Sequence, residues 1–110
     1  MRYSDDGGYT WSAPKLMNNG LKTSDMKHFG TAPGIGITIQ TGKNAGRILA
    51  PIYYNSSTYS GLSGAVLYSD DNGETWQRGA SPNDARASQG LSQISMGEIQ
   101  IVEMPSEGNN

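Results

Sequence analysis

The chain has 110 residues with 15 glycines, no cysteine, and a formal net charge of −2 from 8 basic and 10 acidic residues. The lack of cysteine excludes a disulfide framework and a thiolate metal site. No basic run is present, so binding to nucleic acid or a membrane surface has no electrostatic basis, and the apolar runs are too short to span a bilayer. The glycine-rich composition, only 35% hydrophobic, favours strands and turns, which predicts an all-β fold.

The first third of the chain is predicted to hold a strand pair and a long connection. Residues 1–3 should end one strand, and residues 9–12 should begin its partner. No signal-peptide pattern opens the chain. Residues 14–33 are polar and irregular, and within them residues 23–28 could form one short helical turn.

The middle of the chain is predicted to be a four-stranded antiparallel meander. Isoleucine alternates strictly with other residues in the first strand. Pro51 falls inside the second strand and cannot donate to a ladder, so we expect a sheet edge or a bulge there. Residues 55–63 and 80–96 are predicted as loops. The four strands are predicted at residues 35–39, 47–54, 64–69 and 75–79, and a further strand at residues 98–104.

One turn sequence, S-x-D-x-G-x-T-W, occurs twice in step. Its serine and aspartate side chains can bond nearby backbone N–H groups, its glycine can take a positive φ, and its tryptophan can pin the following strand. We therefore predict two structural hairpin turns, with no direct role in chemistry. The fixed positions are Ser4, Asp6, Gly8, Thr10 and Trp11 in the first turn, and Ser69, Asp71, Gly73, Thr75 and Trp76 in the second.

These elements predict a slice of a β-propeller, about one and a half blades, cut within a blade at both ends. Residues 1–13 would be a half blade, residues 34–79 a full blade, and residues 97–104 the first strand of the next blade. Because strands alternate in direction, the two kinds of connection lie on opposite faces. The short turns share one face, and the longer connections share the other, where we expect the functional site.

The repeated turn is identified as an Asp box, or bacterial neuraminidase repeat. Other stretches resemble, in the same order, the central part of large bacterial sialidases. These stretches are FGTAPGIG (29–36), GRILAPIY (46–53), YSDD (68–71), PNDAR (82–86) and EIQIVEM (98–104). The resemblance implies a partial six-bladed β-propeller from a secreted or cell-surface exo-α-sialidase, which removes terminal sialic acid from sialylated glycans without a cofactor or metal.

The resemblance also implies two site residues. Glu98 matches the glutamate that partners a nucleophilic tyrosine, and Tyr53 matches an aromatic residue lining the pocket, with Tyr54 as the neighbouring alternative. Sialic acid carries a carboxylate on its anomeric carbon, so a neutral tyrosine suits it better than an anionic nucleophile. Tyrosine is weak unless a base takes its proton, the role expected of Glu98. Sialidases with a tyrosine nucleophile are known exceptions to the two-carboxylate scheme.

The resemblance places the nucleophilic tyrosine, the general acid and three carboxylate-binding arginines outside these 110 residues, in the remaining blades. We therefore expect the isolated segment to be inactive. Where relatives often carry a glutamine this chain has Leu62 or Ser63, which leaves linkage and product preference open. The alternatives are a non-catalytic Asp-box propeller segment that binds a glycan or protein, and a relative that transfers sialic acid or forms an anhydro product.

Other polar residues are given structural interpretations. Arg47 lies near the short-turn face, and Arg86 does not match an arginine of the carboxylate-binding set. His28, with no evident partner, is interpreted as an incidental loop residue. The stretch at residues 70–73 faintly resembles a calcium loop, but the later bidentate glutamate is missing.

Overall fold

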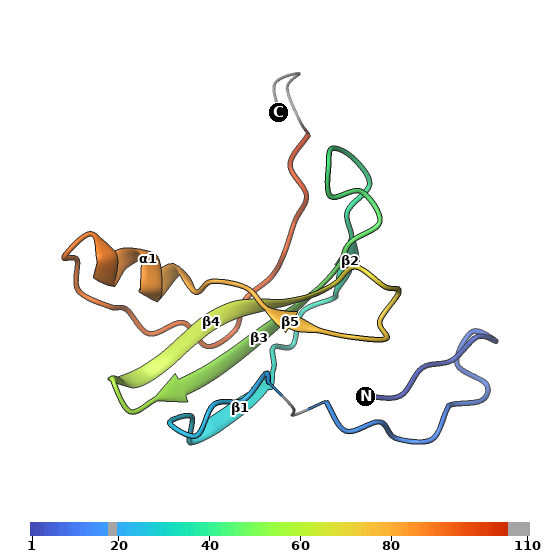
Figure 1. Ribbon diagram of the computed structural model, residues 1–110, viewed down its shortest axis with the longest axis horizontal. Helices are drawn as coiled ribbons and strands as arrows, with labels where there is room; N and C mark the ends of the chain where they lie inside the picture. The colour runs from blue at the N-terminus through green and yellow to red at the C-terminus, as the bar shows by residue number, and fades with distance from the viewer. Residues whose placement is uncertain (18–19, 106–110) are drawn as a thin grey trace.

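The computed structural model describes residues 1–17 and 20–105 and is a flat body of 46 × 40 × 21 Å. One antiparallel sheet occupies its middle, the N-terminal segment lies to one side, and a short helix lies toward the other (Figure 1). The described elements are β1 (His28–Thr31), β2 (Ile37–Thr38), β3 (Ile48–Ser56), β4 (Tyr59–Ser69), β5 (Gln77–Arg78) and α1 (Pro82–Ser88).

The sheet is a meander in which β1 and β2 together form one interrupted strand at an edge of the described sheet, here called the inner strand. β1 pairs with one half of β3, from His28 against Asn55 to Thr31 against Ile52, and β2 pairs with the other half. β4 pairs with the opposite edge of β3, and β5 pairs with β4. The predicted antiparallel meander is therefore present, but its inner strand begins at His28 and is broken in the middle.

Pro51 explains the break in the inner strand. It sits in the middle of β3, opposite Val66 of β4, so the predicted sheet edge at this position is wrong. The carbonyl of Pro51 accepts a hydrogen bond from the N–H of Ala32 at 3.0 Å, so its backbone faces the inner strand. A proline has no N–H to continue that ladder, and β1 and β2 are separated beside it. The bulge in β3 lies elsewhere, between Tyr54 and Ser56.

The hairpin that joins β3 and β4 is longer than the sequence predicted. Residues 55–63 were expected to be a loop, but the two strands pair as far as Ser56 against Tyr59. Backbone hydrogen bonds do not depend on apolar side chains, so a polar, serine-rich stretch can still extend a ladder once its register is set. The long connections at this end of the sheet are therefore those before β1 and after β5.

Helix α1 lies inside the stretch predicted as a polar loop, so that prediction is wrong. The hydroxyl of Ser81 accepts from the N–H of Asn83, the carboxylate of Asp84 accepts from the N–H of Ser81, and Pro82 lies at the start of the helix. Serine, proline and an acidic residue in this order are an N-cap and capping box, which start a helix.

The suggested helical turn at residues 23–28 is not formed. The segment holds one bend, closed by the N–H of Met26 and the carbonyl of Thr23 at 3.1 Å, and β1 begins at His28. Thr23, Ser24 and Asp25 favour local turns over helix interiors because their side chains compete for backbone groups.

The two ends of the described chain contain no strand, although residues 1–3, 9–12 and 98–104 were expected to be extended. The N–H of Ser12 donates to the carbonyl of Tyr3 at 2.8 Å, which holds two arms of the N-terminal turn together. Strands at both ends would need ladder partners from neighbouring blades. The division into a half blade, a full blade and a further strand therefore stays a prediction.

The two faces of the sheet are covered differently. On one face, alternate residues of β3 and β4 form the core together with the connection before β1. This core consists of Leu21, Met26, Ile52, Tyr54, Ala65 and Leu67. The other face is crossed by the chain around Ile99: an added Cβ at Gly64 would lie only 2.8 Å from Ile99 Cγ2. The sheet is thus sandwiched between the segments that precede and follow it.

Candidate functional site

The two Asp turns have the same hydrogen-bond network. In the second turn the hydroxyl of Ser69 donates to Asp71 Oδ1 at 2.8 Å and accepts from the N–H of Gly73 at 2.8 Å. Asp71 Oδ1 also accepts from the N–H of Thr75 at 2.8 Å, and Asp71 Oδ2 accepts from the Thr75 hydroxyl. The indole of Trp76 donates to the Gly73 carbonyl at 3.0 Å. These bonds close the turn from within.

The first turn repeats each of these bonds. Asp6 accepts from Ser4, from the N–H of Thr10 and from the Thr10 hydroxyl, and the Trp11 indole donates to the carbonyl of Gly8. Hydrogen bonds from threonine, first from its hydroxyl and then from its N–H, lower the pKa of Asp6 and of Asp71 from 3.8 to about 2. Both carboxylates are therefore held charged by their own turns.

We expect both turns to weaken in acid. Because the folded pKa of Asp71 is lowered, its contribution is fully present above the ordinary value of 3.8 and is lost as the pH falls through about 2. Asp71→Asn replaces the oxygen that accepts from the Thr75 hydroxyl by an NH₂ group. That variant should be less stable at pH 6 and lose less stability between pH 5 and pH 2. Thermal unfolding followed by circular dichroism measures this, with Asp5→Asn as control; identical pH dependence in Asp71→Asn and wild type would contradict it.

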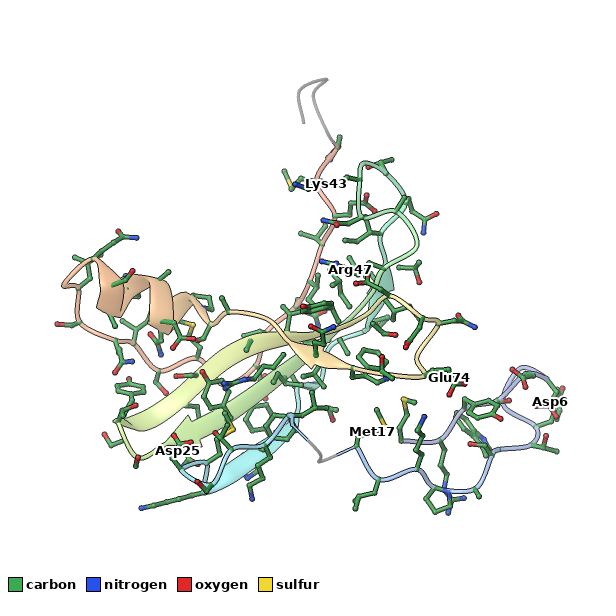
Figure 2. All side chains as sticks on the ribbon, viewed as in Figure 1. Asp6, Met17, Asp25, Lys43, Arg47 and Glu74 are labelled. Atoms are coloured by element: carbon green, nitrogen blue, oxygen red, sulfur yellow. The ribbon has the colours of Figure 1, made fainter. Side chains whose placement is uncertain are left out.

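The second Asp turn and the turn between β2 and β3 lie at the same end of the sheet. Arg47 joins them, because its guanidinium donates to both carboxylate oxygens of Asp70 at 2.7 and 2.9 Å. It also lies over the ring of Tyr68, 4.5 Å from the centroid. Figure 2 shows Arg47 and Glu74 at this end, away from Asp25. Arg47 is therefore structural, as the sequence predicted.

Tyr53 and Glu98 line a common hollow away from the Asp turns. Its volume is about 500 Å³, and its walls come from the break in the inner strand, from β3 and β4, and from the chain after α1. Its lining consists of Thr31, Ala32, Pro33, Tyr53, Leu62, Gly97 and Glu98. The structure thus places the two predicted site residues on one hollow, although 45 positions separate them in sequence (98 − 53). Their roles stay predictions.

Close backbone packing fixes the segment that bears Glu98. An added Cβ at Gly34, in the break of the inner strand, would lie 2.8 Å from the carbonyl oxygen of Ile99. Gly64 of β4 leaves room for the Ile99 side chain, as described above. Gly97 contacts Leu62, since a Cβ there would lie 3.5 Å from Leu62 Cδ1. Glu98 is exposed, between two residues that are both held against the sheet.

His28 was missed by the sequence analysis. It lies in β1, not in a loop, and its ring stacks on that of Tyr53 with the centroids 5.1 Å apart and the planes 22° apart. Gly30, which is opposite Tyr53 in the ladder, leaves space for the two rings to meet. Residues two apart in a strand share a face, so a strand that begins at His28 puts His28 on the same face as Gly30. Because Gly30 is opposite Tyr53, the side chains of His28 and Tyr53 then lie on one face of the sheet.

The remaining polar candidates lie elsewhere. Arg86 donates from Nε to the carbonyl of Ser92 at 2.8 Å, so it helps to close the chain after α1. The carboxylate of Glu103 accepts from the N–H of Gln40 and from the hydroxyl and N–H of Thr41, which lowers its pKa and fastens residue 103 to the β2–β3 turn. In residues 1–17 and 20–105, no group of three or more His, Asp or Glu side chains is placed to hold a metal ion. No helix in the same part of the chain could cross a membrane.

Comparison with known proteins identifies the repeated turn and also finds proteins that are similar to nearly the whole chain. The BNR/Asp-box repeat matches residues 2–13 and 67–78, which contain the two predicted turns. The chain is 41% identical over 105 residues to an anhydrosialidase from Macrobdella decora. It is 30% identical to sialidase-3 from Rattus norvegicus and 30% identical to a sialidase from Paraclostridium sordellii. The alignments cover 96%, 98% and 100% of this chain.

A solved structure agrees with these relatives. A leech intramolecular trans-sialidase complexed with 2,7-anhydro-Neu5Ac superposes with a TM-score of 0.71 at 37% identity, covering 94% of this chain. The likeness confirms an all-β fold that is part of a β-propeller. The chain spans only 12%, 25% and 28% of the three relatives named and 14% of the solved chain. The predicted resemblance to sialidases is confirmed, but its bacterial part is not, because a Macrobdella decora and a rat protein match as well as a Paraclostridium one.

Proposed function

We propose that this chain is a segment of the catalytic propeller of an exo-α-sialidase, which releases terminal sialic acid from glycans. In the longer protein, here called the parent protein, the other blades would supply the tyrosine nucleophile, the general acid and the arginines that hold the substrate carboxylate. The proposal includes a six-bladed propeller and a secreted or cell-surface location. The segment by itself would contribute one wall of the site and would not catalyse the reaction.

The observation that carries the proposal is the hollow shared by Tyr53 and Glu98. Two residues picked from a resemblance to sialidases lie on one concave surface, and the chain is similar to sialidases over nearly all of its length. The hollow also lies away from the Arg47–Asp70 pair and the Asp turn, which have structural partners of their own. A glycan would bind in the hollow, with the ring of Tyr53 against one side of the sugar.

The chemistry assigned to Glu98 is that of a general base toward a tyrosine. As the phenolic oxygen forms its bond to the anomeric carbon, the glycosidic C–O bond breaks and the leaving oxygen takes a proton from the general acid. The tyrosine proton passes to the carboxylate of Glu98. An exposed carboxylate at the wall of an open hollow can reach a side chain contributed by the opposite blade.

The test is release of sialic acid from 3′-sialyllactose by the parent protein, measured by chromatography and mass spectrometry. We expect a sialic acid product and free lactose. Failure to release any sialic acid from 3′- or 6′-sialyllactose would contradict the proposal. Binding of sialyllactose without turnover would support the alternative of a non-catalytic glycan-binding propeller.

A second candidate is an intramolecular trans-sialidase, which makes an anhydro sugar in place of hydrolysing the substrate. The 41% identity to an anhydrosialidase and the likeness to the leech trans-sialidase favour it. The same mass spectrum separates the two, because the anhydro product is lighter than sialic acid by one water.

A further inference from the structure

Asn83, in the first turn of α1, is a buried polar residue with a complete set of partners. It is 1% exposed. Its Nδ2 donates to the carbonyl of Ile94 at 2.8 Å and to the Ser63 hydroxyl at 2.9 Å, and its Oδ1 accepts from the N–H of Ile94 at 3.0 Å. The amide of Asn83 therefore bonds both the N–H and the carbonyl of Ile94, and it also links Ile94 to Ser63 of β4.

Further hydrogen bonds to β4 fix the chain between Ile94 and Glu98. The N–H of Met96 donates to the carbonyl of Leu62 at 2.7 Å, and the Ser95 hydroxyl accepts from the N–H of Leu62. The structure describes residues 89–97 in full, and they contain neither helix nor strand. The path of this stretch is thus set by side-chain and backbone bonds to α1 and β4.

We propose that Asn83 is a positioning residue, which sets where the carboxylate of Glu98 stands on the wall of the hollow. The inference rests on the proposed function, since it acts through Glu98. Asn83 does not line the hollow itself. Without its amide, Ile94 loses both bonds that fix it and the Glu98 carboxylate shifts relative to the tyrosine that it must deprotonate.

The first measurement is the kcat and KM of the parent protein with Asn83→Ala, on 3′-sialyllactose. Displacement of a catalytic group by about 1 Å can cost roughly 100-fold in rate, so we expect kcat to fall about 10- to 100-fold. KM should stay within about twofold, because a general base acts mainly in the transition state. Leu67→Ala is the control, since it removes buried volume at the far end of β4 and should leave kcat within about twofold.

The second measurement is a double-mutant cycle with Glu98→Gln. If Asn83 acts through Glu98, then adding Asn83→Ala to Glu98→Gln should lower kcat by less than about twofold. A general structural role would instead multiply the two losses. Asn83→Asp is the conservative variant: its carboxylate can still accept from the N–H of Ile94 but has lost the two donated bonds. Because this buried carboxylate also places an oxygen against the Ile94 carbonyl, kcat should fall at least as far as in Asn83→Ala, with the same result in the cycle.

The outcomes separate this inference from the function on which it rests. Activity that depends on Glu98 but is lowered multiplicatively by Asn83→Ala, or a rise in KM at constant kcat, overturns the positioning role alone. Failure of both Asn83 variants to fold, seen by circular dichroism, shows a general structural role and overturns it too. A parent protein without sialidase activity overturns both proposals.

Discussion

Glu98→Gln should lower the kcat of the parent protein on sialyllactose by about 10²- to 10⁴-fold, the range that general-base catalysis contributes. Glutamine keeps the size and the hydrogen-bonding shape of the side chain but cannot take a proton from the tyrosine. The carboxylate is exposed on the wall of the hollow, so the substitution leaves packing intact. Steady-state kinetics with wild type and variant at the same pH measure the effect.

Glu74→Gln is the matched control for this experiment. Glu74 lies in the second Asp turn at the opposite end of the sheet, where its carboxylate accepts from Lys15 at 3.3 Å (Figure 2). The same chemical change there should leave kcat unchanged within about twofold. Near-normal turnover in Glu98→Gln would remove the general-base role and, with it, the reason for placing the site in this hollow.

Ile52→Ala should be the most damaging simple truncation in the sheet. Ile52 is 0% exposed, at the centre of the core between β3 and the connection before β1. Removing its side chain loses the burial of several methyl and methylene groups and leaves a cavity, which costs about 2–5 kcal/mol for such residues. Urea unfolding of the 110-residue chain, followed by circular dichroism, gives the change in the free energy of unfolding.

Ile35→Ala provides the comparison, because Ile35 is 80% exposed in the same sheet region. Here the change in the free energy of unfolding should be within about 0.5 kcal/mol. If another blade of the parent protein covers this residue, then the same substitution should cost more there than in the 110-residue chain. Equal losses for Ile52→Ala and Ile35→Ala in the short chain would contradict the described core.

Strand polarity was predictable because the Asp turns fix it. The second turn joins the antiparallel strands β4 and β5, and both turns carry their own hydrogen-bond donors and acceptors within eight residues. The position of the meander and the placement of Tyr53 and Glu98 on one hollow both follow from that local signal together with the resemblance. The Asp-turn sequence can be recognised without knowing which distant residues it will contact, because all of its hydrogen-bond partners lie within the turn.

The features that were missed depend on partners far apart in the chain. His28 stacks on Tyr53 only because β1 pairs with β3 in one register, and its four-residue sequence has no apolar alternation to reveal a strand. Asn83 contacts Ser63 and Ile94, which lie 20 positions before it and 11 after it (83 − 63 and 94 − 83). Helix α1 is different, because Ser81, Pro82 and Asp84 form a helix start signal within four consecutive residues of the sequence.

The break beside Pro51 has a consequence for redesign of the hollow. Residues 32–36 join β1 to β2 without belonging to either strand, and Pro33 is part of the lining. An insertion between Pro33 and Gly34 would therefore change the rim of the hollow without removing a backbone hydrogen bond between β1 or β2 and β3. Libraries that vary loop length at this point would alter the shape of the hollow, whereas a one-residue insertion within β3 would reverse the facing of every strand residue that follows.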